Sequence, residues 1–589
     1  MSKIKIKDIL SHFKLPIFYN SSKTELNKNI VTDLELIDSS NTSNEEEQPI
    51  YNHIFSPSTP FGENTLQLFS QYYTHDTAFL KDTQKMLTSF KKGVSYDPHK
   101  YNNIITAWKE IKEETGFCEK YLYIDWDFGK FLNTNPIFLQ AMTVYNITSP
   151  LLSLFLPIFI LIIPFFIIKF KGVEISIQEY LNVLNVLIAN HAIGKIFTKF
   201  NDVDVTQKMY ILVSAAFYVF SIYQNILVCI RFYSNTKKIH DYLLLFNDYI
   251  KETIDTMDSH LSITQHLTTY TEFNNELIKN KNTLIKYKNK LDTITPFKIS
   301  ISKILNMGHI LQCFYELYDN QEYNDSILYS FGFNGYMDNI SGLSKHISNK
   351  KMNMCTFSKK YKKSSKTNKT TNNNNNNTLF KNAFYPNLID KEPVTNSYNL
   401  TKNIIITGPN ASGKTTLLKT TLINVILSQQ FGYGCYTSAK IVPFQFIHCY
   451  LNIPDTSGRD SLFQAEARRC KEIIDCIHQY PKDTHFCVFD ELYSGTNPEE
   501  AVISAQAFME YITKYKSLSC LLTTHYIQLC KNVSNNDKMQ NYNMKTIKTE
   551  QTLQYTYKLQ EGISDVKGGL KVLTDMNYPT EIINKAIQI

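Results

Sequence analysis

The first part of the chain carries apolar residues at intervals of three and four, the spacing of one face of a helix. This pattern runs from about residue 65 to 145, resumes at Ile239 and continues to about Ile347. From about Phe380 onward, strand-like apolar runs alternate with helix-like segments, which is typical of an α/β domain with a mostly parallel sheet. The pattern therefore predicts a helical region followed by an α/β domain.

Two segments within the helical region are apolar on every face. They are residues 147–168 and 209–230, and neither contains a charged residue. Each is long enough to cross about 30 Å of hydrocarbon as a helix. Membrane helices also tolerate prolines, and the first segment holds Pro150, Pro157 and Pro164. We expect a membrane hairpin, with a buried core segment as the alternative for the first of the two.

The residues between these segments bear on the orientation of the hairpin. Two spans return the chain to its starting side, so the flanking regions are expected on one side of the membrane. An excess of basic residues usually marks cytoplasmic loops. The segment between the two spans should face away from the cytoplasm in this arrangement, yet it is rich in lysine, which argues against that orientation: Lys169, Lys171, Lys195, Lys199 and Lys208. An amphipathic stripe at 177–188 fits either a headgroup-level helix or packing on protein. A re-entrant or interfacial hairpin stays open.

Two polar segments are expected to lack a fold of their own. Residues 1–60 include the acidic stretch DSSNTSNEEEQP, which predicts poor order. Residues 351–379 include SKKYKKSSKTNKTTNNNNNNT, a low-complexity run that cannot build a core. We interpret the second segment as a linker, and contact of its lysines with nucleic acid or lipid phosphate is the alternative.

Composition limits the partners only weakly. The chain has 61 basic and 54 acidic residues, and its net charge of +7 allows nucleic acid or an anionic membrane as a partner without demanding either. The 11 cysteines include no C-x-x-C pair, and the closest two are Cys470 and Cys476, so neither zinc nor a disulfide framework is favoured. The start, MSKIKIKDILSHFKLPIFYN, lacks the features of a cleaved signal peptide.

The motif GPNASGKTT follows the apolar run 404–406 and precedes a helix-like segment. It fits G-x-x-x-x-G-K-[ST], in which backbone N–H groups surround nucleotide phosphates, the lysine reaches the β and γ oxygens, and the hydroxyl binds Mg²⁺. ATP and Mg²⁺ are therefore the expected ligands. The loop contributes Gly408, Pro409, Asn410, Ala411, Ser412, Gly413, Lys414, Thr415 and Thr416.

Three further segments supply the other groups that such a site needs. The strand-like FCVFDE ends in Asp490, suited to hold Mg²⁺ through water, and Glu491, suited to prepare the attacking water. LLTTH ends in His525, which suits contact with the γ-phosphate, although a lone histidine is more often a core residue. Ser461 precedes a helix-like segment and either meets a phosphate or simply caps the helix.

GPNASGKTT, SLFQAE, FDELYSGTNPEEA and TTHYIQLC, in this order, resemble the ATPase domain of the MutS family, within the ABC-type ATPases. The resemblance covers roughly residues 380–589. TPFGENTLQLFSQYYTHDTAFLKDTQKML and GYMDNISGLSKHI are more weakly similar to the family's helical lever domain. The loop reads ASGKT where mismatch-repair members have MGGKS, and no mismatch-reading element is found. The apolar hairpin resembles a membrane-associated branch of the family.

The resemblance implies a head-to-head dimer with two nucleotides at the interface. Lys414 and Thr415 would bind phosphate and Mg²⁺, Asp490 would hold the ion, Glu491 would prepare water and His525 would sense the γ-phosphate. Ser461 would reach the nucleotide of the other subunit. The dimer would be a homodimer or a heterodimer with a related subunit, joined through the ATPase domains.

The predicted architecture is a multidomain α and α/β chain, a helical lever-type region with an inserted transmembrane hairpin followed by a P-loop ATPase domain. The expected function is a membrane-anchored, nucleotide-driven clamp, its ATPase facing the cytoplasm, that associates with DNA independently of sequence. The alternative is a membrane-bound ATPase switch or remodelling protein that does not bind nucleic acid. The predicted segments are 1–60 (poorly ordered), 61–145 and 234–350 (lever-like), 146–233 (hairpin), 351–379 (linker) and 380–589 (ATPase).

Overall fold

The structure is a computed structural model of the chain. It describes residues 6–39, 48–90, 97–113, 115–172, 176–190, 195, 204–298, 305–358, 378–451, 453, 461–548, 553–564, 566, 576, 578–579, 581–583 and 585. The chain forms two compact units. Unit 1 comprises Met1–Tyr101, Thr256–Asn280 and Leu328–Ile589, and unit 2 comprises Asn102–Asp255 and Lys281–Ile327.

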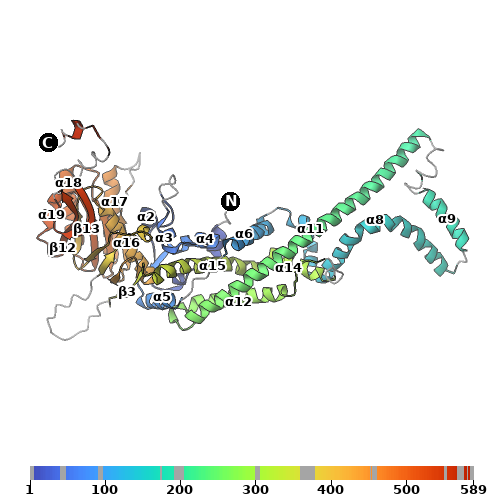
Figure 1. The fold of residues 1–589 in the computed structure, drawn as a ribbon, viewed down its shortest axis with the longest axis horizontal. Helices are drawn as coiled ribbons and strands as arrows, with labels where there is room; N and C mark the ends of the chain where they lie inside the picture. Colours follow the sequence, from blue (N-terminus) through green and yellow to red (C-terminus); the bar gives the residue numbers. More distant parts are fainter. Residues whose placement is uncertain are drawn as a thin grey trace. The chain divides into compact units, whose positions relative to one another are not determined.

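The elements of the amino-terminal part of unit 1 are short (Figure 1). They are α1 (Ile6–His12), η1 (Pro16–Tyr19), β1 (Lys23–Glu25), α2 (Lys28–Asp33), α3 (Ile50–Phe55), α4 (Pro60–Phe69), β2 (Tyr72–Thr74) and α5 (Thr77–Ser89). η3 (Thr268–Tyr270) also belongs to this unit. Four helices contribute residues to both units: α6 (Pro98–Glu113), α11 (Val205–Thr264), α12 (Thr271–Leu291) and α15 (Gln321–Ser348).

The expectation of poor order in residues 1–60 is wrong for the described part of that segment. Phe13 is fully buried, and its ring lies 5.2 Å from that of Tyr329 on α15. A Cβ added at Gly332 would lie 2.3 Å from Phe13 Cβ, so this glycine admits the ring. The apolar residues of these short elements are buried partly against partners far along the chain, which local composition does not reveal. Most of the acidic stretch lies outside the described residues.

The ATPase part of unit 1 contains two larger sheets. Their strands are β3 (Asn353–Phe357), β4 (Leu379–Ala383), β5 (Asn396–Asn399), β6 (Asn403–Thr407), β7 (Tyr433–Gly434), β8 (Ser438–Ile441), β9 (Phe446–Tyr450), β10 (His485–Asp490), β11 (Leu518–Thr523), β12 (Met539–Lys548) and β13 (Leu553–Glu561). The helical elements are η4 (Pro386–Leu388), α16 (Lys414–Phe431), α17 (Leu462–Gln479), α18 (Pro498–Ile512) and α19 (Ile527–Val533). The predicted alternation of strands and helices is confirmed.

The six-stranded sheet positions the phosphate-binding loop. Its order is β13-β12-β6-β11-β10-β9, parallel from β12 to β9 with β13 antiparallel on β12. One face buries Ile405 and Leu522 against α17, α18 and α19. α16 packs against β10 and β11. Successive side chains of a strand point to opposite faces of the sheet, so every second residue of these strands faces α16. Parallel strands bring their carboxyl ends to one edge, where Asp490 ends β10 and Thr523 ends β11.

The second sheet contains residues that were predicted to belong to a linker, so that prediction is wrong for them. Its order is β5-β4-β8-β3-β7, and β3 occupies 353–357 within the segment predicted as a linker. Cys355 is buried at the centre of this strand, and β3 pairs with β8 and β7. Strand pairing with residues far along the chain outweighs the polar local composition. The asparagine-rich run, residues 359–377, lies outside the described residues.

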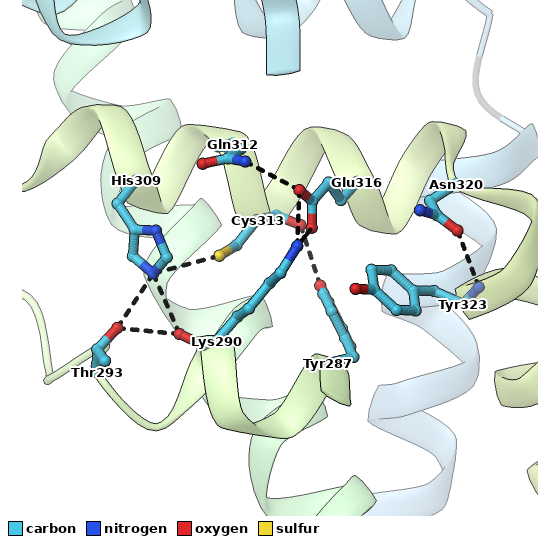
Figure 2. A network of polar contacts seen from close by, with 9 residues as sticks. All are labelled: Tyr287, Lys290, Thr293, His309, Gln312, Cys313, Glu316, Asn320 and Tyr323. Carbon is cyan, nitrogen blue, oxygen red and sulfur yellow. Dashed lines mark hydrogen bonds and ion pairs between the residues drawn. The ribbon is translucent and has the colours of Figure 1, made fainter. Parts of the chain in front are cut away.

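Unit 2 is helical in its described part. Besides its shares of the four helices above, it contains α7 (Phe117–Tyr121), η2 (Asp127–Thr134), α8 (Pro136–Phe170), α9 (Ile177–Asn190) and α14 (Met307–Asp319). Polar contacts join α12 to α14 (Figure 2): Lys290 Nζ lies 2.7 Å from Glu316 Oε2, and Tyr287 donates to the Cys313 carbonyl at 3.0 Å. His309 Nε2 lies 3.1 Å from Thr293 Oγ1 in the same network. These contacts fix the register of the two helices.

The apolar segments 147–168 and 209–230 lie in α8 and α11. Among the described residues, one helix is long and apolar enough by length and composition to cross a membrane, and it is α11. Many side chains of α8 are outside the description, but Phe155 and Phe166 are exposed. Tyr218 of α11 donates to the Ser153 carbonyl of α8 at 3.3 Å, and Asn225 also bonds Ser153. The helical prediction is confirmed for both segments, and the spans stay predictions.

Candidate functional site

The phosphate-binding loop connects β6 to α16, as the motif predicted. All five residues of β6 are buried, which suits a central parallel strand rich in isoleucine. Gly413 caps α16 with φ 94°, in the left-handed region that favours glycine. A Cβ added there would lie 3.1 Å from the Tyr557 ring. The loop conformation therefore requires glycine at this position.

Lys414 lies over the loop. Its Nζ donates to the carbonyls of Gly408 at 3.1 Å and Pro409 at 3.2 Å, and it lies 3.1 Å from His525 Nε2. Burial lowers the pKa of Lys414, while the carboxylates of Glu491 and Asp490 oppose that shift. The ammonium group is therefore held by weak carbonyl partners, which phosphate oxygens with full charge would replace.

The residues predicted for Mg²⁺ meet at the edge of the sheet. Thr415 donates to Asp490 Oδ2 at 2.9 Å. Thr523 also donates to Asp490, through Oδ1. Hydroxyl and carboxylate oxygens are ligands that Mg²⁺ accepts, directly or through water. The oxygen donors present thus fit this ion, and Thr523 is a positioning residue that sequence reasoning did not find.

Glu491 and His525 form the next pair. Glu491 Oε1 lies 2.9 Å from His525 Nε2. The hydrogen bond from His525 lowers the pKa of Glu491; burial opposes this, and the charges of His525 and Lys414 add to it. Glu491 has φ 53°, a conformation that costs a non-glycine residue about 1–3 kcal/mol and is common at functional sites. Its backbone N–H donates to the Thr523 carbonyl at 3.0 Å, which holds the residue there.

His525 Nε2 contacts both Lys414 and Glu491, but one ring nitrogen can serve only one of them at a time. With a proton on Nε2, the ring donates to Glu491. Without it, Nε2 accepts from Lys414. The histidine therefore links Lys414 to Glu491, and sequence reasoning did not predict this contact.

Ser461 caps α17. Its Oγ accepts from the Gln464 N–H at 3.3 Å, and the Gln464 side chain accepts from the Ser461 N–H at 2.9 Å, completing a capping box. Ser461 does not line the pocket beside the P-loop in its own chain. Further along α17, Glu466 accepts from the backbone N–H groups of Ser494 at 3.0 Å and Gly495 at 3.2 Å. The helix is thereby tied to the loop that follows Glu491.

A pocket of about 580 Å³ lies beside the P-loop. Asn410, Lys414, Thr415 and Glu491 line one part of it. The remaining wall is largely apolar, and the sequence analysis assigned none of its residues to the site: Ala383, Phe384, Tyr385, Leu388, Val394, Met544 and Tyr557. These residues lie on separate strands and turns, so no local motif could reveal them.

Comparisons with known proteins agree with this geometry. Residues 404–589 match the sequence profile of MutS domain V. This match, together with the relatives that follow, supports a relationship of this chain to the MutS family. The chain is 30% identical over 210 residues to MutS protein homolog 4 of Mus musculus, covering 34% of this chain and 21% of that protein. It is 28% identical over 210 residues to Endonuclease MutS2 of Staphylococcus epidermidis, covering 35% and 26%.

A third MutS-family relative is DNA mismatch repair protein MutS of Staphylococcus haemolyticus, 28% identical over 184 residues, which cover 31% of this chain and 20% of that protein. The chain thus matches between a fifth and about a quarter of the length of these relatives. The matches support ATP hydrolysis as the chemistry of the MutS-type domain.

Proposed function

We propose that the protein is a MutS-like ATPase that acts as a dimeric, nucleotide-driven clamp anchored in a membrane and associated with DNA. The observation that carries the ATPase part is the convergence of Lys414, the Thr415–Asp490 pair and the Glu491–His525 pair at one sheet edge. These are the groups that phosphoryl transfer to water requires.

Each side chain has a proposed role in the ATP-bound state. Lys414 exchanges the loop carbonyls for the β- and γ-phosphate oxygens, and Thr415 and Asp490 hold Mg²⁺. The bound ion supplies neutralisation of phosphate charge. Glu491 orients the attacking water and accepts its proton, and His525 contacts the γ-phosphate. The apolar wall around Phe384 receives the base.

Dimerisation is proposed from the place of Ser461. Its hydroxyl caps α17, and Ser461 is not among the residues that line the pocket of its own chain. In the proposed dimer it contacts the nucleotide of the second subunit instead. ATP then stabilises the closed dimer because it binds that state more tightly than the open one. The partner is a second copy of this chain or a related subunit.

Membrane anchoring rests on α8 and α11. Exposed large apolar side chains occupy both helices, among them Phe155, Phe166, Phe217 and Phe220. Polar contacts at Ser153 hold the two helices together, a common way to join helices in lipid. The ATPase and helical regions would face the cytoplasm.

Association with DNA is proposed from the names of the relatives, through phosphate contacts that ignore sequence. The same exposed apolar helices favour a second candidate, a membrane-bound ATPase switch or remodelling protein that does not bind nucleic acid.

Binding of the detergent-solubilised protein to homoduplex, mismatched and branched DNA distinguishes the two candidates. Each DNA is titrated with ADP or a non-hydrolysable ATP analogue across a salt series. The DNA clamp predicts nucleotide-dependent binding that weakens steeply with salt. Absence of binding at low salt, in protein that still hydrolyses ATP, would contradict the DNA clamp and leave the second candidate.

A further inference from the structure

Three side chains with metal-binding atoms meet in the MutS-type domain, outside the nucleotide site. They are His448 on β9, Cys476 on α17 and His485 at the start of β10, and one ligand atom from each lies within 4.8 Å of the others. β9 and β10 are parallel neighbours, with His485 opposite Phe446. The two histidines are therefore offset by two residues and share one face of the sheet.

The hydrogen bonds of His485 define which of its nitrogens is free for a metal. Nε2 lies 2.9 Å from the Tyr480 carbonyl, which can only accept, so Nε2 carries the proton. Nδ1 then presents a lone pair, which accepts a hydrogen bond from His448 Nε2 at 3.2 Å. Binding of a metal between these two nitrogens would replace that bond and move the His448 proton to its Nδ1. Two nitrogens bound to one tetrahedral zinc at 2.0–2.1 Å are about 3.3 Å apart. A metal-bound imidazole usually donates its other N–H to a carbonyl or carboxylate, as His485 does.

Zinc binds the thiolate form of cysteine and the neutral form of histidine, so metal binding would release the proton of the Cys476 thiol. The positive charge of Arg469 is offset by Glu472 at 3.3 Å.

We propose that His448, Cys476 and His485 bind one Zn²⁺ ion, with the fourth tetrahedral position open to water. One thiolate and two imidazoles are ligands that zinc accepts, whereas Mg²⁺ and Ca²⁺ prefer oxygen. The site would join α17 to β9 and β10, and α17 is the helix that Ser461 caps. Cysteine spacing did not predict zinc because the three ligands come from three separate elements.

Cobalt titration tests this site directly. The full-length, detergent-solubilised protein is stripped of metal with a chelator and titrated with Co²⁺, whose thiolate complexes have a near-ultraviolet charge-transfer band. We expect saturation near one equivalent and displacement by Zn²⁺. Cys476→Ser should abolish the band, and His448→Asn should weaken Co²⁺ binding by at least about tenfold. Cys229→Ser is the matched control, because Cys229 is also half-buried and lies on α11.

Binding of a non-hydrolysable ATP analogue, measured on every variant, shows whether the domain is folded. If Cys476→Ser fails to bind the analogue, the variant is not folded, and the Co²⁺ affinity of His448→Asn is then the test of the site. Absence of a charge-transfer band in the stripped, analogue-binding protein would overturn the proposal. Retention of tight binding in a folded His448→Asn variant would overturn it as well.

Discussion

Glu491 Oε1 and His525 Nε2 lie 2.9 Å apart at the ends of two neighbouring parallel strands. The same histidine nitrogen lies 3.1 Å from Lys414 Nζ. His525 thus lies in contact with both the Lys414 ammonium and the Glu491 carboxylate. Arrival of a γ-phosphate at Lys414 would change the partner of His525 and, through it, the environment of Glu491.

Replacing Lys414 by Ala should weaken ATP binding and abolish nucleotide-dependent dimerisation. Loss of a charged hydrogen bond costs about 1.5–3 kcal/mol, or about 10- to 150-fold in Kd. Fluorescent ATP-analogue titration measures the affinity. Lys419→Ala is the control, since it removes the same charge from α16 and Lys419 does not line the pocket. Unchanged affinity in Lys414→Ala would contradict the P-loop assignment.

Replacing Glu491 by Gln should leave ATP binding intact and lower turnover by at least about 10²-fold, because the amide cannot accept a proton from water. The ATP-bound dimer should then accumulate. Phosphate release and light scattering measure the two effects. Glu499→Gln, on the first turn of α18, should behave as the parent protein. Undiminished turnover in Glu491→Gln would show that another residue prepares the water.

Glu110 offers a test of unit 2. It accepts hydrogen bonds from Lys120 at 3.0 Å and Tyr121 at 2.8 Å, and also bonds Tyr242 and Lys238. Burial would raise its pKa, but the bonds from Lys238, Tyr242, Lys120 and Tyr121 prevail and lower it to about 2 from a usual 4.5. Its carboxylate therefore stabilises the fold above pH 4.5, and that contribution is lost as pH falls toward 2.

The measurement is the difference in thermal midpoint between the parent protein and Glu110→Gln as a function of pH. The difference should be largest near neutral pH and should shrink between about pH 4.5 and 2. Subtracting one thermal midpoint from the other cancels the pH-dependent contributions of titratable groups that both proteins share. A difference that stays constant over this window would contradict the Glu110 network.

Membrane anchoring predicts that charges on the exposed apolar helices release the protein. Phe155→Asp combined with Phe217→Asp should shift it from the membrane pellet to the supernatant after alkaline extraction, because an Asp at a helix centre costs about 2.5–3.5 kcal/mol in lipid. Ile503→Asp is the control, since Ile503 is an equally exposed apolar residue on α18. Extraction of the unaltered protein into the supernatant would contradict the anchor.

Local sequence patterns placed several predicted site residues on the elements where the structure has them, because these residues follow single strands closely. The glycines, Lys414 and Thr415 follow one strand within a few residues, and Asp490 ends another. The contact of His525 with Lys414 and the role of Thr523 beside Asp490 depend on strand order, which the pattern did not specify. Their roles in the reaction stay predictions.

The amino-terminal fold was missed for a related reason. Phe13 is packed by Tyr329 and Tyr336, which lie far along the chain. Tyr72 and Tyr73 lie within the stretch of helical periodicity that begins near residue 65, but they belong to β2, which pairs with β1. Short elements are decided by tertiary partners more than by their own periodicity.

In the proposed function, ATP drives this chain between two assembly states. The most direct test is the molar mass of the detergent-solubilised protein, by size exclusion with light scattering, in Mg²⁺ with a non-hydrolysable ATP analogue and in Mg²⁺ with ADP. We expect a dimer with the analogue and dissociation with ADP. One mass in both nucleotides, in protein that binds them both, would contradict it.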